Sequence, residues 1–269
     1  MVSKETVNKV MKNIDRRNVT DVRIYPSIVA FVLALYAVVA VYTLYFMDSG
    51  FTEYEKLLQT LGVVVVGMGI LLALMNVLAS RTYKHNKKDV SLFDSLIELS
   101  TEIYKEKGID GGQYITKMKD RDIDNKGQRT IYLIFLIAVV PAIIATVLMV
   151  FDITNPVTVT AATVLFVMSL VICAFVLFIN IRYPRKHEKA FIKFTDAFCE
   201  GMKECGITVR GYEPVIGVRS TPLMLFLTLI TLGMFFIVWV YLSLRDMNRH
   251  LDQQWNFENS LVDVLSVIN

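Results

Sequence analysis

Charged residues are missing from five long stretches of this 269-residue chain. Each stretch runs for 21 to 25 residues without Asp, Glu, Lys, Arg or His; they are Tyr25–Phe46, Leu57–Ala79, Thr130–Val150, Val157–Ile181 and Pro222–Leu244. A helix of about 20 apolar residues crosses the hydrocarbon core of a bilayer. Core helices of a soluble protein would carry some charge on their outer faces, so the absence of charge predicts membrane-spanning helices.

The sequence also lacks the signatures of catalysis and of cofactor binding. Neither Gly-x-Ser-x-Gly nor His-Glu-x-x-His occurs, and the three cysteines have no metal-ligand spacing. The apolar stretches contain no ionisable side chain of the kind that marks proton relays and ion pathways. The polar first 24 residues do not resemble a cleavable signal peptide. We therefore expect no enzyme activity, no catalytic residue, no cofactor and no metal.

Lys and Arg exceed Asp and Glu by only 28 to 25, which gives no indication of nucleic-acid binding, but their distribution is uneven. The first 25 residues hold six basic residues, segment Arg81–Arg129 eleven and segment Arg182–Thr221 eight. The short connectors Met47–Lys56 and Asp152–Pro156 together hold only one. Because basic loops stay in the cytoplasm, the pattern predicts a multi-pass protein of the cell membrane with a cytoplasmic N-terminus.

The two halves of the chain resemble each other. A shift of 98 residues places Phe93 on Phe191 and Glu102 on Glu200, and it aligns the Gly-Ile pairs that begin at Gly108 and Gly206. This similarity predicts a duplicated unit of two spans followed by a cytoplasmic amphipathic helix. The predicted fold is therefore an all-α polytopic membrane bundle. Its parts are an N-terminal segment with a short amphipathic helix (1–24), two repeats (25–129 and 130–221), and a fifth apolar span with a polar tail (222–269).

Each predicted amphipathic helix has an apolar face at helical spacing and ends at a C-cap glycine, Gly108 or Gly206. These faces are the candidate interaction surface, formed by Leu92, Phe93, Leu96, Phe191, Phe194 and Phe198. Two arrangements remain open at this point. The helices lie in the headgroup plane with the apolar side down, or they pack on one another as a small cytoplasmic domain.

All three histidines follow an apolar stretch and a basic residue, as Arg81-x-x-x-His85, Arg182-x-x-x-x-His187 and Arg245-x-x-x-x-His250. The third occurrence suggests a partial third copy of the repeat. A metal site would require the histidines to converge together with a further ligand such as Asp or Cys. Since Lys and Arg surround each histidine in the sequence and disfavour a cation, the pattern favours a basic cluster at the membrane surface.

The fifth stretch, Pro222–Leu244, admits two structures. As one helix it crosses the membrane and places the C-terminus outside. If Thr231-Leu232-Gly233 forms a turn instead, the segment dips into the membrane and returns, as the third-copy interpretation requires. The arms of such a hairpin are too short to cross, and a turn exposed to lipid would leave backbone groups unpaired. We therefore expect a continuous helix containing Gly233.

Part of this stretch resembles a known family. Thr231-x-Gly233, then Trp239-x-Tyr241, then Arg245-Asp246-x-Asn248 are similar to the signature of a family of small prokaryotic membrane proteins of unassigned function. The likeness covers residues 228–249, and it departs from the signature at Met234-Phe235, where a Tyr often follows the glycine. It implies a prokaryotic membrane protein and supplies no activity.

Two functions fit this sequence. A non-enzymatic scaffold or assembly subunit would use its amphipathic helices to bind a cytoplasmic protein partner, a second copy of the chain, or the bilayer. The alternative is a channel or carrier for a small neutral or apolar solute. Its path would contain Asn76 and Asn180, the strongly polar side chains within the spans, for which contacts between helices are the ordinary explanation. Of the two, the sequence favours the scaffold.

Overall fold

The computed structural model describes residues 2–45, 52–120, 125–151, 154–231 and 233–268. Within these ranges the chain is all-helical, with 86% of residues in helices and no strand, which confirms the all-α prediction. The helices are α1 (Lys4–Asp15), α2 (Arg17–Thr20), α3 (Pro26–Tyr45), α4 (Glu53–Lys107), α5 (Gly112–Lys119), α6 (Asn125–Phe151), α7 (Pro156–Glu204), α8 (Thr221–Ile230) and α9 (Phe235–Ile268).

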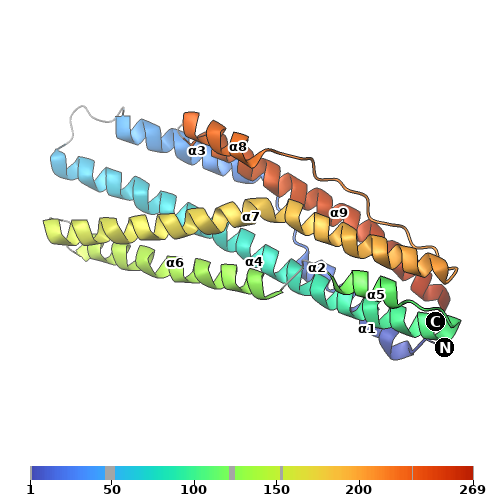
Figure 1. Ribbon diagram of the computed structural model, residues 1–269. Coiled ribbons are helices and arrows are strands. Elements are labelled where there is room, and N and C mark those ends of the chain that lie inside the picture. The colour runs from blue at the N-terminus through green and yellow to red at the C-terminus, as the bar shows by residue number, and fades with distance from the viewer. Residues whose placement is uncertain (1, 46–51, 121–124, 152–153, 232, 269) are drawn as a thin grey trace.

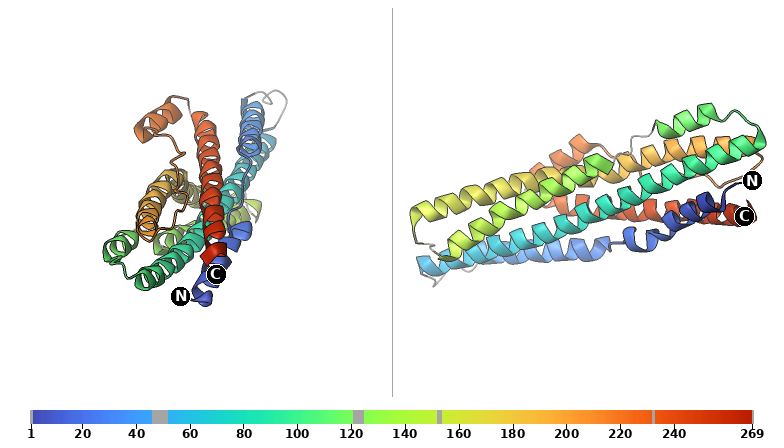
Figure 2. Two further views of the ribbon diagram at one scale, coloured as in Figure 1. Left: turned by 90° about the vertical axis from the view of Figure 1, so that its right-hand side faces the viewer. Right: turned by 90° about the horizontal axis from the view of Figure 1, so that it is seen from below.

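The helices form an elongated bundle (Figure 1). The apolar stretches of the sequence lie at one end of it, here called the apolar end, and the charged segments lie at the other, the polar end. The apolar end contains α3, α6, α8 and the first parts of α4, α7 and α9, and the polar end contains α1, α2, α5 and the remaining parts of the three long helices (Figure 2). Four helices, α3, α4, α6 and α7, are long and apolar enough to cross a membrane. Large apolar side chains on α3, α6 and α7, such as Phe31, Ile137 and Val171, are exposed.

Two of the helices extend through both ends of the bundle without interruption. Helix α4 has 55 residues and α7 has 49, which at a rise of 1.5 Å per residue makes them about 82 Å and about 74 Å long. Each therefore joins a predicted span to the amphipathic helix that follows it. Helix α4 begins at a capping box formed by Thr52 and Glu55 and ends at Gly108, whose φ of 67° is left-handed. Gly206, just after α7, has a φ of 77°. Both C-cap glycines are thus confirmed.

The apolar faces of the amphipathic segments meet inside the polar end. The six side chains of the candidate interaction surface are all buried there and pack in one cluster; they are Leu92, Phe93, Leu96, Phe191, Phe194 and Phe198. The rings of Phe93 and Phe194 stack with their centroids 3.8 Å apart. Val10 of α1 and Phe257 of α9 complete the cluster. Of the two open arrangements, the described residues therefore adopt the packed domain, and these faces are internal to the chain.

The fifth apolar stretch is not one helix, so the expected continuous span is wrong. Helix α8 ends at Ile230, α9 begins at Phe235, and Gly233 between them has a φ of 91°. The backbone groups of this turn are paired by the chain itself: the Gly233 amide donates to the Thr228 carbonyl (2.7 Å), and the Phe235 amide donates to the Thr231 hydroxyl (2.9 Å). This local pairing removes the cost that had argued against a turn.

Because the chain turns back after α8, its two ends lie at the same end of the bundle (Figure 1). Helix α9 runs from the apolar end beside α3 to the polar end, where it packs against α7 and α1. The expectation that the C-terminus lies on the opposite side from the N-terminus is therefore wrong. The predicted connectors at 47–56 and 152–156 fall partly outside the described residues, and their acidic residues Asp48 and Asp152 are among those not described.

The effect of Gly233→Ala on stability distinguishes a turn at this position from a continuous helix, because the two structures predict changes of opposite sign. Gly233→Ala should lower the stability of the protein by about 1–2 kcal/mol, because an L-residue is strained at a positive φ. In a continuous helix the same change would raise stability by up to about 1 kcal/mol. Thermal unfolding in mild detergent, followed by circular dichroism, measures the difference. Gly69→Ala is the matched control, because Gly69 lies inside α4 with open space around its Cα, and this change should stabilise.

Candidate metal centre

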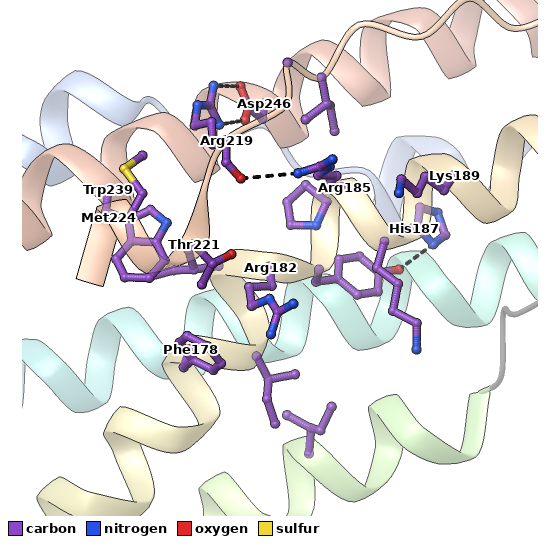
Figure 3. A pocket seen from close by; sticks show the side chains of 18 of the residues that line it. Phe178, Arg182, Arg185, His187, Lys189, Arg219, Thr221, Met224, Trp239 and Asp246 are labelled. Atoms are coloured by element: carbon purple, nitrogen blue, oxygen red, sulfur yellow. Dashed lines mark hydrogen bonds and ion pairs between the residues drawn. The ribbon is translucent and has the colours of Figure 1, made fainter. Parts of the chain in front are cut away.

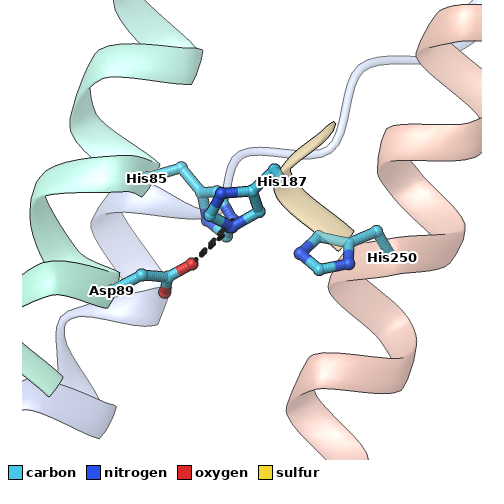
Figure 4. A group of neighbouring side chains, drawn as sticks. All are labelled: His85, Asp89, His187 and His250. Carbon is cyan, nitrogen blue, oxygen red and sulfur yellow. Dashed lines mark hydrogen bonds and ion pairs between the residues drawn. The ribbon is translucent and has the colours of Figure 1, made fainter. Parts of the chain in front are cut away.

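The three histidines, far apart in the sequence, converge at one level of the polar end (Figure 4). His85 comes from α4, His187 from α7 and His250 from α9, and Asp89 lies one helical turn after His85. One ligand atom from each of these four residues lies within 4.8 Å of the other three, and all four side chains are buried. The interpretation of these histidines as a basic cluster at the membrane surface is therefore wrong, and the convergence that a metal site requires is present.

The closest contacts within the group join nitrogen to nitrogen and nitrogen to carboxylate. His85 Nε2 lies 3.2 Å from His187 Nε2. The Oδ2 atom of Asp89 lies 2.8 Å from His187 Nε2 and 3.1 Å from His85 Nε2. Three electron-rich atoms are thus held together in a space that solvent does not reach. Such a group needs a proton or a cation between its members.

Each imidazole is oriented through its other ring nitrogen by a residue outside the group. Asp21, which follows α2, lies 2.8 Å from His85 Nδ1. The hydroxyl of Tyr183 lies 2.9 Å from His187 Nδ1, and the hydroxyl of Tyr212 lies 2.7 Å from His250 Nδ1. A carboxylate or oxygen on the distal nitrogen is the arrangement that fixes the tautomer and ring orientation of metal-binding histidines.

The hydrogen bonds around Tyr212 determine the tautomer of His250. The carboxylate of Glu188 accepts the Tyr212 hydroxyl (2.9 Å) and the backbone amides of Val215 (2.8 Å) and Ile216 (3.2 Å). Since the one proton of the Tyr212 hydroxyl is donated to Glu188, this oxygen accepts a hydrogen bond from His250 Nδ1–H. The neutral imidazole then has a lone pair on Nε2. This Nε2 is buried and makes no hydrogen bond within the described part of the chain.

The same reasoning applies to His187. The hydroxyl of Tyr183 lies 3.3 Å from Asn86 Oδ1 and can donate its proton there, so that it accepts from His187 Nδ1–H. The Nε2 lone pair of His187 then points toward Asp89. Burial lowers the pKa of both His187 and His250, which keeps these imidazoles neutral at pH 7.

Buried charges surround the group. The Lys88 ammonium donates to Asp21 (2.6 Å) and Glu258 (2.7 Å) and lies 3.4 Å from Asp89. Gln254 donates to the second oxygen of Asp89 at 2.7 Å. Burial alone would raise the pKa of the Asp89 carboxyl, but its attraction to His85 and Lys88 outweighs burial and lowers that pKa. Asp89 is therefore an ionised ligand at neutral pH.

This set of atoms fits a divalent transition metal. Imidazole nitrogen and carboxylate oxygen are ligands of zinc, and a tetrahedral ion with bonds of about 2.0–2.1 Å separates its ligand atoms by roughly 3.3 Å. The separations of His85 Nε2 from His187 Nε2 (3.2 Å) and from Asp89 Oδ2 (3.1 Å) are close to that value, whereas the 2.8 Å between His187 and Asp89 is shorter and would lengthen around an ion. Without a metal ion, a proton on His85 Nε2 can be donated to Asp89 or to His187, but His250 Nε2 then has no hydrogen-bond partner among the described residues. A metal ion would satisfy all four atoms at once.

Three i, i+4 pairs, one from each long helix, build this level of the bundle. They are His85 with Asp89, Tyr183 with His187, and His250 with Gln254. The 98-residue shift of the repeat places His85 on Tyr183 (85 + 98) and Asp89 on His187 (89 + 98). The two halves thus contribute a pair each at corresponding positions. This correspondence, together with the three histidines, is the sequence signal that could have indicated the site.

The other residues singled out in the sequence lie elsewhere. Asn180 is buried and donates to the Val176 carbonyl of its own helix (2.9 Å), whereas Asn76 is exposed. Asn248, from the stretch that resembles a known family, holds the N-terminal segment: its amide donates to the Ile24 carbonyl (2.8 Å), and its oxygen accepts from Arg81 (2.8 Å).

Comparisons with protein-family models, with curated proteins and with solved structures find no match, so the function is inferred from the side chains themselves.

Lys88 provides a test of the charge network. Lys88→Met should destabilise the protein by about 3–5 kcal/mol, because it leaves Asp21 and Glu258 buried without their partner. Chemical denaturation in detergent measures the change. Lys87→Met removes the same charge from the exposed neighbouring position and should change stability by no more than about 0.5 kcal/mol. Equal effects of the two substitutions would contradict the network.

Proposed function

We propose that this protein is a multi-pass membrane scaffold whose polar helical domain is fastened by a divalent transition-metal ion, most suitably Zn²⁺. The observation that carries the proposal is the buried Nε2 atom of His250. It faces two further imidazoles and an ionised carboxylate and has no hydrogen-bond partner among the described residues. A buried polar atom left without a partner costs about 1–3 kcal/mol, which a coordinate bond to a metal would offset.

A structural role suits this ion better than a catalytic one. Four protein ligands fill a tetrahedral shell, and catalytic zinc sites keep one position open for water or substrate. The four side chains are at most 2% exposed, so the group is closed to solvent. An ion held by α4, α7 and α9 would tie the C-terminal helix to both halves of the duplicated chain.

The membrane placement is supported by two independent features. The helices of the apolar end carry exposed apolar side chains, which hydrocarbon would cover. The basic residues of segments 81–129 and 182–221 lie on the parts of the chain that include the polar end, so this end would face the cytoplasm together with both termini. We therefore assign the protein to the cell membrane with its metal-binding domain in the cytoplasm.

The scaffold assignment follows from where this protein places its polar groups. The buried charged side chains lie outside the predicted spans, which contain no Asp, Glu, Lys, Arg or His. A rigid cytoplasmic domain on membrane anchors is suited to binding a protein partner or a second copy of the chain. In the duplicated unit, with a partial third copy in α8 and α9, each long helix would join an apolar membrane segment to the polar domain.

The metal is testable by direct analysis. Protein purified in mild detergent through a tag without histidine should contain about one zinc ion per chain, measured by inductively coupled plasma mass spectrometry. His250→Ala and His187→Ala should lose the ion, because each removes a ligand. Cobalt substituted for zinc should give the visible absorption of tetrahedral coordination, and this absorption should be absent from the His250→Ala variant.

Asn256→Ala is the matched control for this experiment, since Asn256 is exposed on the same helix as His250 and should leave the zinc content unchanged. Circular dichroism of each variant establishes whether its helices form. Wild-type protein that binds neither zinc nor cobalt after dialysis against the metal would refute the metal site. So would a folded His250→Ala variant with the wild-type metal content.

The orientation makes a separate prediction. Tags placed before Met1 and after Asn269 should both be inaccessible to antibody in intact cells and accessible after permeabilisation. A cysteine introduced by Ser49→Cys, in a chain without its native cysteines, should react with an impermeant reagent from outside. A C-terminal tag that is accessible in intact cells would show that the last apolar segment crosses the membrane.

A further inference from the structure

A cavity of about 820 Å³ lies against α7 just below the metal centre, bordered by α6, by the chain leading into α8, and by α9 (Figure 3). Specific ligand sites in proteins commonly have volumes of about 300–1,000 Å³. His187 and Tyr183, which orients it, form part of the wall, so the cavity adjoins the metal centre.

The two ends of the cavity differ in chemistry. One end is lined by the apolar and aromatic side chains of Phe178, Met224 and Trp239. The other end is lined by Arg182, Lys186 and Lys189. These three basic residues are four and three positions apart, so they lie along one face of α7.

The basic residues of this face have no acidic partner among the described residues. Arg182 stacks over the ring of Phe178 at 5.3 Å, which places its guanidinium at the junction of the apolar and basic ends. The neighbouring arginines have partners within the chain: Arg219 forms an ion pair with Asp246, and Arg185 donates a hydrogen bond to the Arg219 carbonyl at 3.3 Å. Arg182, Lys186 and Lys189 thus present positive charge that no acidic residue in the described part of the chain neutralises.

The junction between the two ends coincides with the end of an apolar stretch. The charge-free segment Val157–Ile181 stops one residue before Arg182. In the membrane placement proposed above, on which this inference rests, Phe178 and Trp239 lie at the depth of acyl chains and Arg182 and Lys186 at the depth of headgroup phosphates. Basic pockets between helices at this depth suit anionic phospholipid headgroups.

We propose that this cavity binds an anionic phospholipid, with its phosphate on Arg182 and Lys186 and an acyl chain along Phe178 and Trp239. Basic residues at the membrane surface commonly attract anionic lipid without a defined site, and two features distinguish this cavity from that case. It is concave, and its lining combines basic side chains with apolar ones such as Phe178 and Trp239. Both parts of one amphipathic molecule are therefore accommodated together.

The fluorescence of Trp239 tests the proposal. Full-length protein is reconstituted into phosphatidylcholine vesicles with a minor fraction of phosphatidylglycerol whose acyl chains carry bromine, which quenches tryptophan on contact. Quenching should be several-fold stronger than with the same fraction of brominated phosphatidylcholine. Trp239→Phe identifies the quenched emission, because the other tryptophan, Trp255, lies in the polar domain.

Variants separate a defined site from general attraction to a charged surface. Arg182→Ala with Lys186→Ala should abolish the several-fold preference for phosphatidylglycerol, because each charge contributes about five-fold to the attraction of an anionic lipid. Lys84→Ala with Lys87→Ala removes two exposed charges at the same level of α4, outside the cavity, and should change it by less than about two-fold. Equal losses from the two double variants would overturn the site.

Two further outcomes overturn the lipid assignment. If soluble inorganic phosphate or glycerol phosphate relieves the quenching, the cavity takes a free phosphate compound instead. If the inserted wild-type protein shows no preference between the two lipids, the cavity is not an anionic lipid site. Vesicle flotation and zinc content are measured on the same samples, so that a failure of membrane insertion or of metal binding is distinguished from a failure of lipid binding.

Discussion

The polar end of this protein depends on how one buried nitrogen is satisfied. His250 Nε2 is brought by α9 to a point where α4 and α7 already supply two imidazoles and a carboxylate. The residues behind each ring, Asp21, Tyr183 and Tyr212, hold it in the orientation that turns the ring toward the common centre. Once these hydrogen bonds are formed, the helices cannot rotate or slide without leaving buried polar atoms unpaired. The bound ion that we propose would stabilise this arrangement by coordinating side chains from all three helices at once.

Much of the fold was predictable because apolar length and the absence of charge are properties of local sequence. The long apolar helices α3, α4, α6 and α7 follow from runs without charge, and the positive φ angles of Gly108 and Gly206 follow from the geometry of helix ends. What local sequence does not contain is whether a helix continues past its apolar part. Helices α4 and α7 do continue, because the apolar faces of their amphipathic halves pack against each other and are buried without a membrane surface.

The convergence of the three histidines and the turn at Gly233 were not predicted from the sequence, for a shared reason. Lysines beside the histidines in the sequence seemed to exclude a cation, but the helical period exposes Lys84 and Lys87 to solvent and buries Lys88 against three carboxylates. At the turn, a general rule about unpaired backbone groups was sound, but the Thr231 side chain supplies the missing partner. In both places the structure depends on the direction of a single side chain, Lys88 at the histidines and Thr231 at the turn. The spacing of residues in the sequence does not determine that direction.

The uninterrupted length of α4 has a mechanical consequence. A helix without a hinge between its polar and apolar halves behaves as a stiff rod, and His85 lies 32 residues from its first residue, about 48 Å along the axis. A rotation of about 5° at the level of the histidines would therefore displace the far end of the rod by roughly 4 Å. Helix α7 differs in this respect, because it contains Pro184 three residues before His187, and a proline inside a helix removes a backbone hydrogen bond and favours a kink. Small changes in geometry at the histidines are thus magnified at the apolar end of α4, at the opposite end of the molecule.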